Sequence, residues 1–310
     1  MGLSPAAHDI VLLTGGTGGA KLALGIAEAY GPERLAAIVN TGDDIEIYGA
    51  HVSPDPDLVC FWLAGLIDER GWGLAGDTFA VMDALRELGV EVWFNLGDRD
   101  LAWCLERARM LADGLTPAAA LGHLGGAIGL RARVLPMSDA PVRTWVRTPA
   151  AGWSAFQEFM IRARAAGPVE GLEFRGADAA APGEGVLEAI ELASVIVIGP
   201  SNPLASIAPI LAVPGIREAL AASPAPVVAV SPIVGGEVLK GPTRDFMAFA
   251  GLAADAAGVR DFYGELLDGF VSDEPLGGPG TLQTDTRMGD ADGRSRLARA
   301  SVSFAEGLRR

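Results

Sequence analysis

The first residues that could do chemistry form a glycine-rich loop near the start of the chain. The loop lies between the apolar stretch Ile10–Leu13 and a stretch of helical pattern, 20–29, and it consists of Gly15, Gly16, Thr17, Gly18 and Gly19. Glycines let backbone N–H groups approach an anion closely, and a helix N-terminus favours negative charge. Lys21, one of only two lysines in the chain, follows. A tight turn that binds nothing is the alternative, but this combination favours phosphate binding.

The loop matches neither of the two common nucleotide-binding fingerprints. A Walker A loop carries Gly-Lys followed by Ser or Thr, whereas Gly19 is followed here by Ala20 and Lys21. In the pattern G-x-G-x-x-G, Lys21 would occupy the position of the third glycine. The sequence therefore predicts a phosphate site of another kind.

Four aspartates are expected at the same edge of the predicted sheet. Asp43 and Asp44 follow the second predicted strand, 36–39, and Asp55 and Asp57 come shortly after them. Grouped carboxylates beside a phosphate suit Mg²⁺, and one of them could instead accept a proton from an attacking hydroxyl. Any one of them alone is better explained as a turn residue or a helix N-cap, but the four together favour a functional site.

Other polar residues lie where further predicted elements begin or end. The guanidinium of Arg99 suits a phosphate or a flavin-type carbonyl, whereas Asp77 is better explained as a helix cap. Lys240 is expected near the same edge of the sheet. Two later apolar strands, 195–198 and 227–230, run into loops that contain the candidates Pro200, Ser201, Asn202 and Ser231.

The repeated strand–loop–helix units predict an α/β fold with a Rossmann-like, mostly parallel, doubly wound sheet. Its core is expected in residues 1–125 and 186–310, with a smaller inserted subdomain at 126–185. Within the insertion, Arg131–Leu135 and Thr144–Arg147 are predicted as antiparallel strands, and Trp153–Ala165 as an amphipathic helix. Ligands of such sheets bind at the carboxyl ends of the strands, so the candidate residues above should meet there.

Composition excludes several classes of partner. A net charge of −15 argues against nucleic acid, because a phosphate backbone needs a basic surface. The two cysteines form no C-x-x-C pair, and the three histidines lack metal-ligand spacing. No apolar run predicts a signal peptide or a membrane span, so a cytoplasmic protein is expected.

Seven motifs, taken together and in this order, resemble the 2-phospho-L-lactate transferase family (CofD) of deazaflavin coenzyme F420 biosynthesis. The resemblance covers roughly residues 10–275. The motifs are Gly15–Gly19, Asn40–Asp44, Ser53–Asp57, Leu96–Asp100, Leu135–Asp139, Gly199–Pro203 and Ser231–Ile233.

The resemblance implies a specific reaction. Such enzymes transfer a phospho-three-carbon acid from its guanosine-diphosphate conjugate to the ribityl hydroxyl of the deazaflavin Fo, release GMP and need Mg²⁺, and they are usually dimers. It places Asp57 and Arg99 near Fo. The glycine loop and the 199–203 loop would hold the guanosine diphosphate, and Asp43, Asp44, Asp55 and Asp57 would supply metal ligands. Asp57, Asp44 and Lys21 are the catalytic candidates.

Two alternatives from other classes share this kind of fold. One is an NAD(P)-dependent oxidoreductase, disfavoured because the second strand ends in Asn40-Thr41-Gly42 where a ribose-binding acid is expected. The other is a nucleotide-binding protein without turnover, disfavoured by the four aspartates. The sequence does not distinguish 2-phospholactate, phosphoenolpyruvate and 3-phosphoglycerate as the transferred acid.

Overall fold

A seven-stranded sheet forms the centre of the computed structural model, which describes residues 8–238 and 241–308. All its strand pairs are parallel, in the order β14-β13-β10-β9-β1-β2-β5. The prediction of an α/β fold with a parallel sheet is confirmed. The strands are β1 (Ile10–Thr14), β2 (Leu35–Val39), β5 (Arg133–Pro136), β9 (Val195–Ile198), β10 (Val227–Val230), β13 (Gly269–Ser272) and β14 (Thr281–Gln283).

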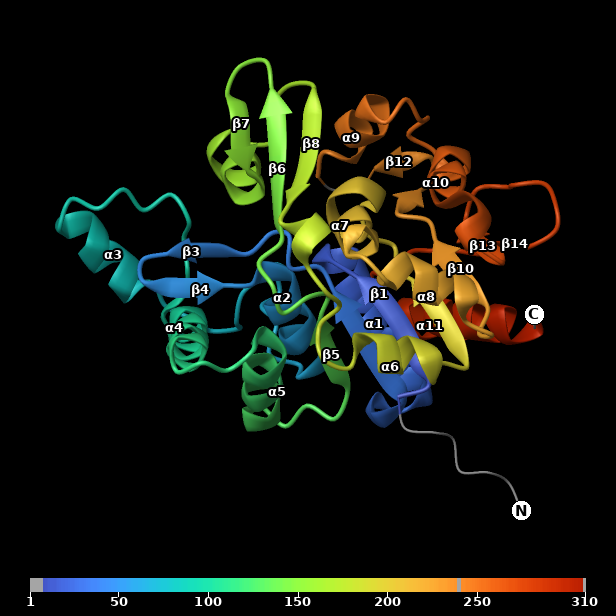
Figure 1. Cartoon of the computed structure of the whole chain (residues 1–310), viewed down its shortest axis with the longest axis horizontal. Helices are drawn as coiled ribbons and strands as arrows, with labels where there is room; N and C mark the ends of the chain where they lie inside the picture. Colours follow the sequence, from blue (N-terminus) through green and yellow to red (C-terminus); the bar gives the residue numbers. More distant parts are fainter. Residues whose placement is uncertain (1–7, 239–240, 309–310) are drawn as a thin grey trace.

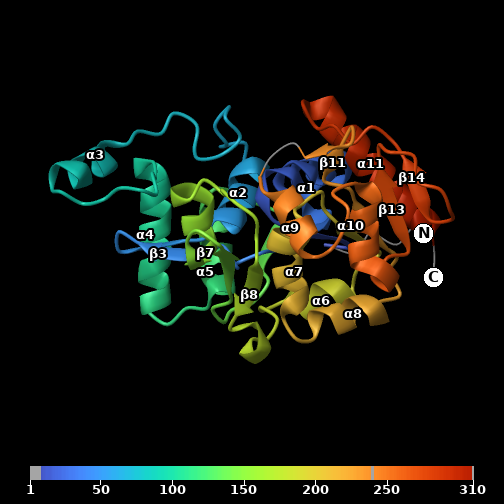
Figure 2. The same ribbon diagram turned by 90° about the horizontal axis from the view of Figure 1, so that it is seen from above.

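Helices cover both faces of this sheet (Figures 1 and 2). In β1, Ile10 and Leu12 join one apolar core, and Val11 and Leu13 join the other. Strands buried on both faces need continuous apolar sequence, which is why these strands could be recognised. The first core is closed by α1 (Gly16–Tyr30), α2 (Pro54–Leu63), α5 (Pro117–Ala127) and α11 (Ala291–Gly307). The second is closed by α6 (Val186–Glu191), η4 (Pro203–Ile207), α7 (Ala208–Ala212), α8 (Ile216–Ala222), α9 (Thr243–Phe249) and α10 (Ala256–Tyr263).

A separate three-stranded antiparallel sheet stands beside the carboxyl edge of the main sheet (Figure 1). It consists of β6 (Arg143–Thr148), β7 (Gly152–Ala155) and β8 (Gly171–Arg175), in the order β7-β6-β8. These strands lie within the segment 126–185, for which the sequence predicts an inserted subdomain. The strand predicted at Thr144–Arg147 is confirmed as part of β6.

Two predictions for this segment are wrong. Arg131–Leu135 is not an antiparallel strand, because β5 pairs in parallel with β2 at the edge of the main sheet. An edge strand has one neighbour, so its alternating arginines and apolar residues imitate a half-buried antiparallel strand. The helix predicted at Trp153–Ala165 is instead β7 followed by a short π-helix, η2 (Glu158–Arg162). Short apolar runs of this kind fit either period.

An arm extends away from the sheet on the side of α3 (Figure 1). It contains the hairpin β3 (Ile45–Ile47) and β4 (Ala50–Val52), together with α3 (Ala80–Glu87) and α4 (Asp98–Ala112). The arm has its own small apolar core, which includes Val52, Met82 and Leu101. A second hairpin, β11 (Ile233–Val234) and β12 (Glu237–Val238), follows β10, and three short 3-10 helices, η1 (Pro32–Arg34), η3 (Ala177–Ala179) and η5 (Gly264–Leu266), complete the elements.

Among the described residues, no single helix is long and apolar enough to cross a membrane. One bent pair, Pro203–Ala212 with Ile216–Ala222, reaches that length and composition only when its two parts are taken together, and they meet at 88°. Side chains of this pair, such as Leu204, Ile210 and Leu220, are buried in the second core.

Candidate functional site

The loops that follow β1, β2, β9 and β10 meet at one end of the parallel sheet, around a cavity of about 1050 Å³. The glycine loop and the aspartates of 43–57 are in direct contact there, because the backbone N–H of Gly16 donates to Oδ1 of Asp55 over 2.8 Å. The prediction that these two segments share one edge of the sheet is therefore confirmed. The predicted residues that line the cavity are Gly15, Gly16, Thr17, Gly18, Lys21, Asp43, Asp55, Asp57, Pro200, Ser201, Asn202 and Ser231.

Close packing explains part of the glycine pattern. A Cβ at Gly15 would collide with the Asp55 carboxylate, and a Cβ at Gly18 would collide with the carbonyl oxygen of Pro200. Gly16 has a φ of 66°, a region that residues with a Cβ rarely adopt. The N–H of Gly15 donates to the Ser201 hydroxyl over 3.2 Å. The loop is thus both a tight turn and the N-terminus of α1.

The N-terminus of α1 still offers donors to an anion. A helix leaves its first four N–H groups without intrahelical acceptors, and here Gly16 uses one of them on Asp55. The N–H groups of Thr17 and Gly18 belong to the same first turn, and both residues line the cavity, so these donors face an anion bound there. Lys21 lines the same cavity, with its Nζ 5.7 Å from the centre of the Trp62 ring.

Asp43 and Asp55 form a close pair of buried carboxylates. One amide nitrogen, Nδ2 of Asn40, donates to Asp43 over 3.1 Å and to Asp55 over 3.0 Å. Burial raises the pKa of Asp43 well above its ordinary value, and the charge of Asp55 raises it further. Burial also raises the pKa of Asp55 to about 6, although hydrogen bonds from Asn40 and Gly16 act in the opposite direction. Two repelling carboxylates held by one neutral amide fit a divalent cation with oxygen ligands.

The other two predicted metal ligands are already occupied by protein donors. Asp44 accepts a hydrogen bond from the Ser53 hydroxyl over 2.7 Å and contacts Nε2 of His51 at 3.2 Å, and it does not line the cavity. Asp57 forms a buried ion pair with Arg107 and accepts a hydrogen bond from Trp103 Nε1 over 2.8 Å. Of the four aspartates, Asp43 and Asp55 therefore have the geometry best suited to a metal.

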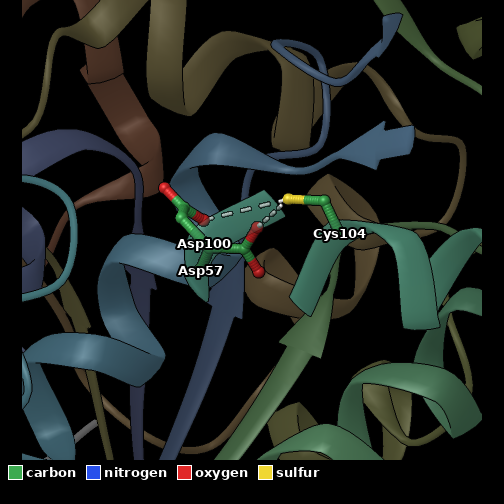
Figure 3. Close-up of side chains that lie close together, drawn as sticks. All are labelled: Asp57, Asp100 and Cys104. Atoms are coloured by element: carbon green, nitrogen blue, oxygen red, sulfur yellow. Dashed lines mark hydrogen bonds between the residues drawn. The ribbon is translucent and has the colours of Figure 1, made fainter. Parts of the chain in front are cut away.

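Asp57 also belongs to a cluster with Asp100 and Cys104 (Figure 3), whose ligand atoms lie within 4.8 Å of one another. The guanidinium of Arg107 already supplies a cation to this cluster, which explains the cluster without a metal. Burial raises the pKa of Asp100 to about 7, and the charges of Asp57 and Asp77 act in the same direction. Asp100 lines the cavity beside Asp57.

The structure does not bring every predicted residue to the cavity. Arg99 is exposed and does not line the cavity, and its guanidinium donates to the Ala75 carbonyl over 3.2 Å. Asp77 is a helix cap, as predicted, but it caps α4 and not the helix that directly follows it, because it accepts from the N–H groups of Arg99 and Asp100. Gly19 packs against Thr14 and Ser201 behind the loop. Lys240 lies outside the described residues.

Sequence reasoning missed several residues of the site. Arg107 is in the middle of α4 and carries no motif, so nothing local marks it as the partner of Asp57. The cavity also has an apolar wall, which a scan for charged motifs does not detect. Its members come from the arm, the loop after α2 and the small sheet: Trp72, Phe79, Trp93, Phe94, Phe156, Met160 and Ile161.

The fold and this cavity define a class: an α/β protein with a glycine-rich loop, a buried carboxylate pair and an apolar wall around one cavity. The 2-phospho-L-lactate transferase CofD family matches the chain over residues 10–277. The chain belongs to this family and is a transferase, so the oxidoreductase alternative is excluded.

Similar proteins carry two names. A phosphoenolpyruvate transferase from Kitasatospora aureofaciens is 42% identical over 97% of this chain and 98% of its own length. A 2-phospho-L-lactate transferase from Methanosarcina mazei is 40% identical over 86% of this chain and 87% of its own. A solved structure from the UPF0052 family of Bacillus halodurans has a TM-score of 0.64 at 20% identity, covering 97% of this chain and 100% of that one, which shows the fold alone.

Proposed function

We propose that this enzyme transfers a phospho-three-carbon acid from its guanosine-diphosphate conjugate to the ribityl hydroxyl of Fo, in coenzyme F420 biosynthesis. The acid is 2-phospholactate, phosphoenolpyruvate or 3-phosphoglycerate. The names of the relatives support the acid class. The observation that carries the proposal is the buried pair Asp43 and Asp55 in contact with the N-terminus of α1, inside one cavity with an apolar wall.

The proposed reaction is a displacement at phosphorus. The hydroxyl oxygen of Fo forms a bond to the phosphorus that carries the acid, the bond from this phosphorus to the oxygen bridging to GMP breaks, and GMP leaves. Catalysis of such a step is mostly positioning and stabilisation of charge. The N–H groups of Thr17 and Gly18 and the ammonium of Lys21 would bind the diphosphate.

Asp43 and Asp55 would hold the Mg²⁺ ion. The ion would supply a positive charge that neutralises the diphosphate, which these two carboxylates would otherwise repel. Asn40 keeps the two carboxylates together, and Gly16 fixes Asp55 relative to the loop. The chain would thereby hold a bound cation close to the N–H groups of the glycine loop.

A carboxylate must take the proton of the Fo hydroxyl. Asp57 is one of the predicted catalytic residues, and Asp100 is its neighbour on the cavity wall. Asp57 already accepts from Arg107 and Trp103, so we propose that it orients the wall while Asp100 is the more accessible acceptor. The deazaflavin ring would lie against the apolar wall that includes Trp93, Phe94 and Met160.

One incubation tests this function. The purified protein is mixed with Fo, Mg²⁺ and each of the three guanosine conjugates in turn, and the products are identified by mass. We expect GMP and one phosphodiester of Fo, both lost when EDTA is added. Absence of product with all three donors would contradict the proposal. We also predict that the protein is a homodimer, lies in the cytoplasm and has no nucleic acid or membrane partner. Light scattering of the purified protein tests the predicted dimer.

Substitutions at single residues, measured in the same assay, test which side chains take part in the reaction. Asp55→Asn should reduce turnover at least a hundredfold, because one of the two metal ligands loses its charge. Asp100→Asn should lower kcat by a larger factor than it changes the KM of either substrate. Asp261→Asn, an exposed aspartate on α10, is the matched control and should leave turnover unchanged.

A further inference from the structure

The segment between β14 and α11 reaches the cavity from a part of the chain that lies beyond the family match. That match ends at residue 277, whereas Thr286, Arg287, Met288 and Gly289 line the cavity. The segment is carried by α11, which packs against α1, the helix that follows the glycine loop (Figures 1 and 2). None of the seven motifs that resemble the family includes these residues.

Few positive charges line the cavity. Among the residues described in 8–238 and 241–308, the cationic side chains that line it are Lys21, Arg70 and Arg287. Five carboxylates line the same cavity: Asp43, Asp55, Asp57, Asp77 and Asp100. In a chain with a net charge of −15, these three cations are the side chains of the cavity that can attract a polyanionic ligand.

The segments that carry Lys21, Arg70 and Arg287 all lie near the ring of Trp62. Lys21 Nζ lies 5.7 Å from the Trp62 ring, and Gly71, next to Arg70, packs so that a Cβ there would be 3.9 Å from that ring. Arg294, in the first turns of α11, also lies 5.7 Å from the ring. Arg287 is joined to those turns, because its carbonyl accepts from Arg296 over 3.2 Å.

The backbone of the segment is fixed, while the guanidinium of Arg287 is accessible. Asp285 accepts from the Arg287 N–H over 3.0 Å and from Arg296 over 2.9 Å, and Asp290 caps α11 through the Gly293 N–H. The Arg287 side chain is 75% exposed and pairs with Asp285 at 3.3 Å. An exposed pair of this kind contributes little, so exchanging it for a bidentate phosphate contact is favourable.

Thr286 adds a second polar group to the same wall. The residue is 3% exposed, and its hydroxyl has no hydrogen-bond partner among the described residues. A buried hydroxyl without a partner is unfavourable, and rotation about its χ1 angle can direct it to a ligand. A hydroxyl donates well to a phosphate oxygen.

We propose that Thr286 and Arg287 bind the diphosphate of the guanosine-linked donor, opposite the N-terminus of α1. This inference rests on the proposed function for the identity of the donor. The segment after β14 then forms one wall of the donor site. The acceptor wall, which comes from the arm and the small sheet, is formed by other parts of the chain.

GDP binding measured by calorimetry in the presence of Mg²⁺ tests this inference separately from turnover. Arg287→Ala should weaken GDP binding about tenfold or more, and Arg287→Lys should lie between Arg287→Ala and the wild type, because it keeps the charge but loses the planar fork. Thr286→Val should weaken binding several-fold without lowering the melting temperature of the ligand-free protein, since the hydroxyl has no partner to lose. Arg299→Ala, an exposed arginine on α11, is the matched control.

In turnover, the same variants should raise the KM for the donor by similar factors and leave kcat and the KM for Fo within about twofold. Failure of the wild type to bind GDP, or equal GDP binding by Arg287→Ala, Thr286→Val and the wild type, would overturn the inference. If the wild type binds GDP and Arg287→Ala does not, while no donor is transferred to Fo, the inference stands and the proposed function fails.

Discussion

The buried ion pair between Asp57 and Arg107 makes the strongest prediction about stability. Both residues are almost completely buried, at 4% and 3% exposure. Replacing Arg107 with Met leaves the Asp57 carboxylate buried with only Trp103 and the Cys104 thiol as partners. Stranding a buried charge costs about 3–5 kcal/mol, and loss of the Arg107 bond to the His51 carbonyl adds about 1 kcal/mol. Arg107→Met should therefore lose about 4–6 kcal/mol of unfolding free energy.

A second variant separates charge from packing. In Asp57→Asn/Arg107→Met neither member of the pair carries a charge, and the amide oxygen of the introduced asparagine can still accept from Trp103. The double variant should therefore be more stable than Arg107→Met by about 2 kcal/mol or more. Urea unfolding followed by circular dichroism measures both differences. Arg109→Met, an exposed position on the same helix paired with Glu106 and Asp113, should cost less than about 1 kcal/mol. A loss below about 1 kcal/mol for Arg107→Met, or a double variant no more stable than the single one, would refute this reasoning.

Three further predictions concern the cavity rim and the cysteines. Gly18→Ala should lose about 1–3 kcal/mol of stability and raise the donor KM, because its Cβ collides with the Pro200 carbonyl; urea unfolding and kinetics check this, and an unchanged KM would contradict it. Mg²⁺ should raise the melting temperature of the wild type but not of Asp43→Asn or Asp55→Asn, as thermal unfolding with and without EDTA shows; an equal rise in all three would exclude the pair as ligands. Burial raises the pKa of the Cys60 and Cys104 thiols, so neither should react with a thiol reagent at about pH 8 until the protein unfolds, and rapid labelling of the native protein would show that they are accessible.

Local patterns in the sequence specify most of the central sheet. β1, β9 and β10 are short apolar runs that end in glycine, proline or serine, and each is a strand of the sheet where predicted. The glycine loop and the Asn40–Asp44 segment follow strands, so parallel topology alone brings them together.

Long-range pairing could not be derived in the same way. β5 belongs to the main sheet because it pairs with β2, almost a hundred residues earlier, and no local signal records that partner. The ion pair of Asp57 joins residues 50 positions apart. The sequence therefore places Asp57 correctly at the site but assigns it as a metal ligand and catalytic residue, because the motif that contains Asp57 gives no sign of its partner Arg107. Arg99 shows the converse, because a residue in a recognisable motif can donate to a nearby carbonyl and lie outside the cavity.

The position of Trp62 makes its intrinsic fluorescence a reporter of the groups around it. Its ring has the ammonium of Lys21 and the guanidinium of Arg294 each 5.7 Å from its centre. Of the six tryptophans, Trp72 and Trp93 line the cavity, from the loop after α2 and from the arm. A diphosphate that draws Lys21 off the indole would change the emission of the unlabelled protein, so stopped-flow fluorescence can time nucleotide arrival without a modified substrate.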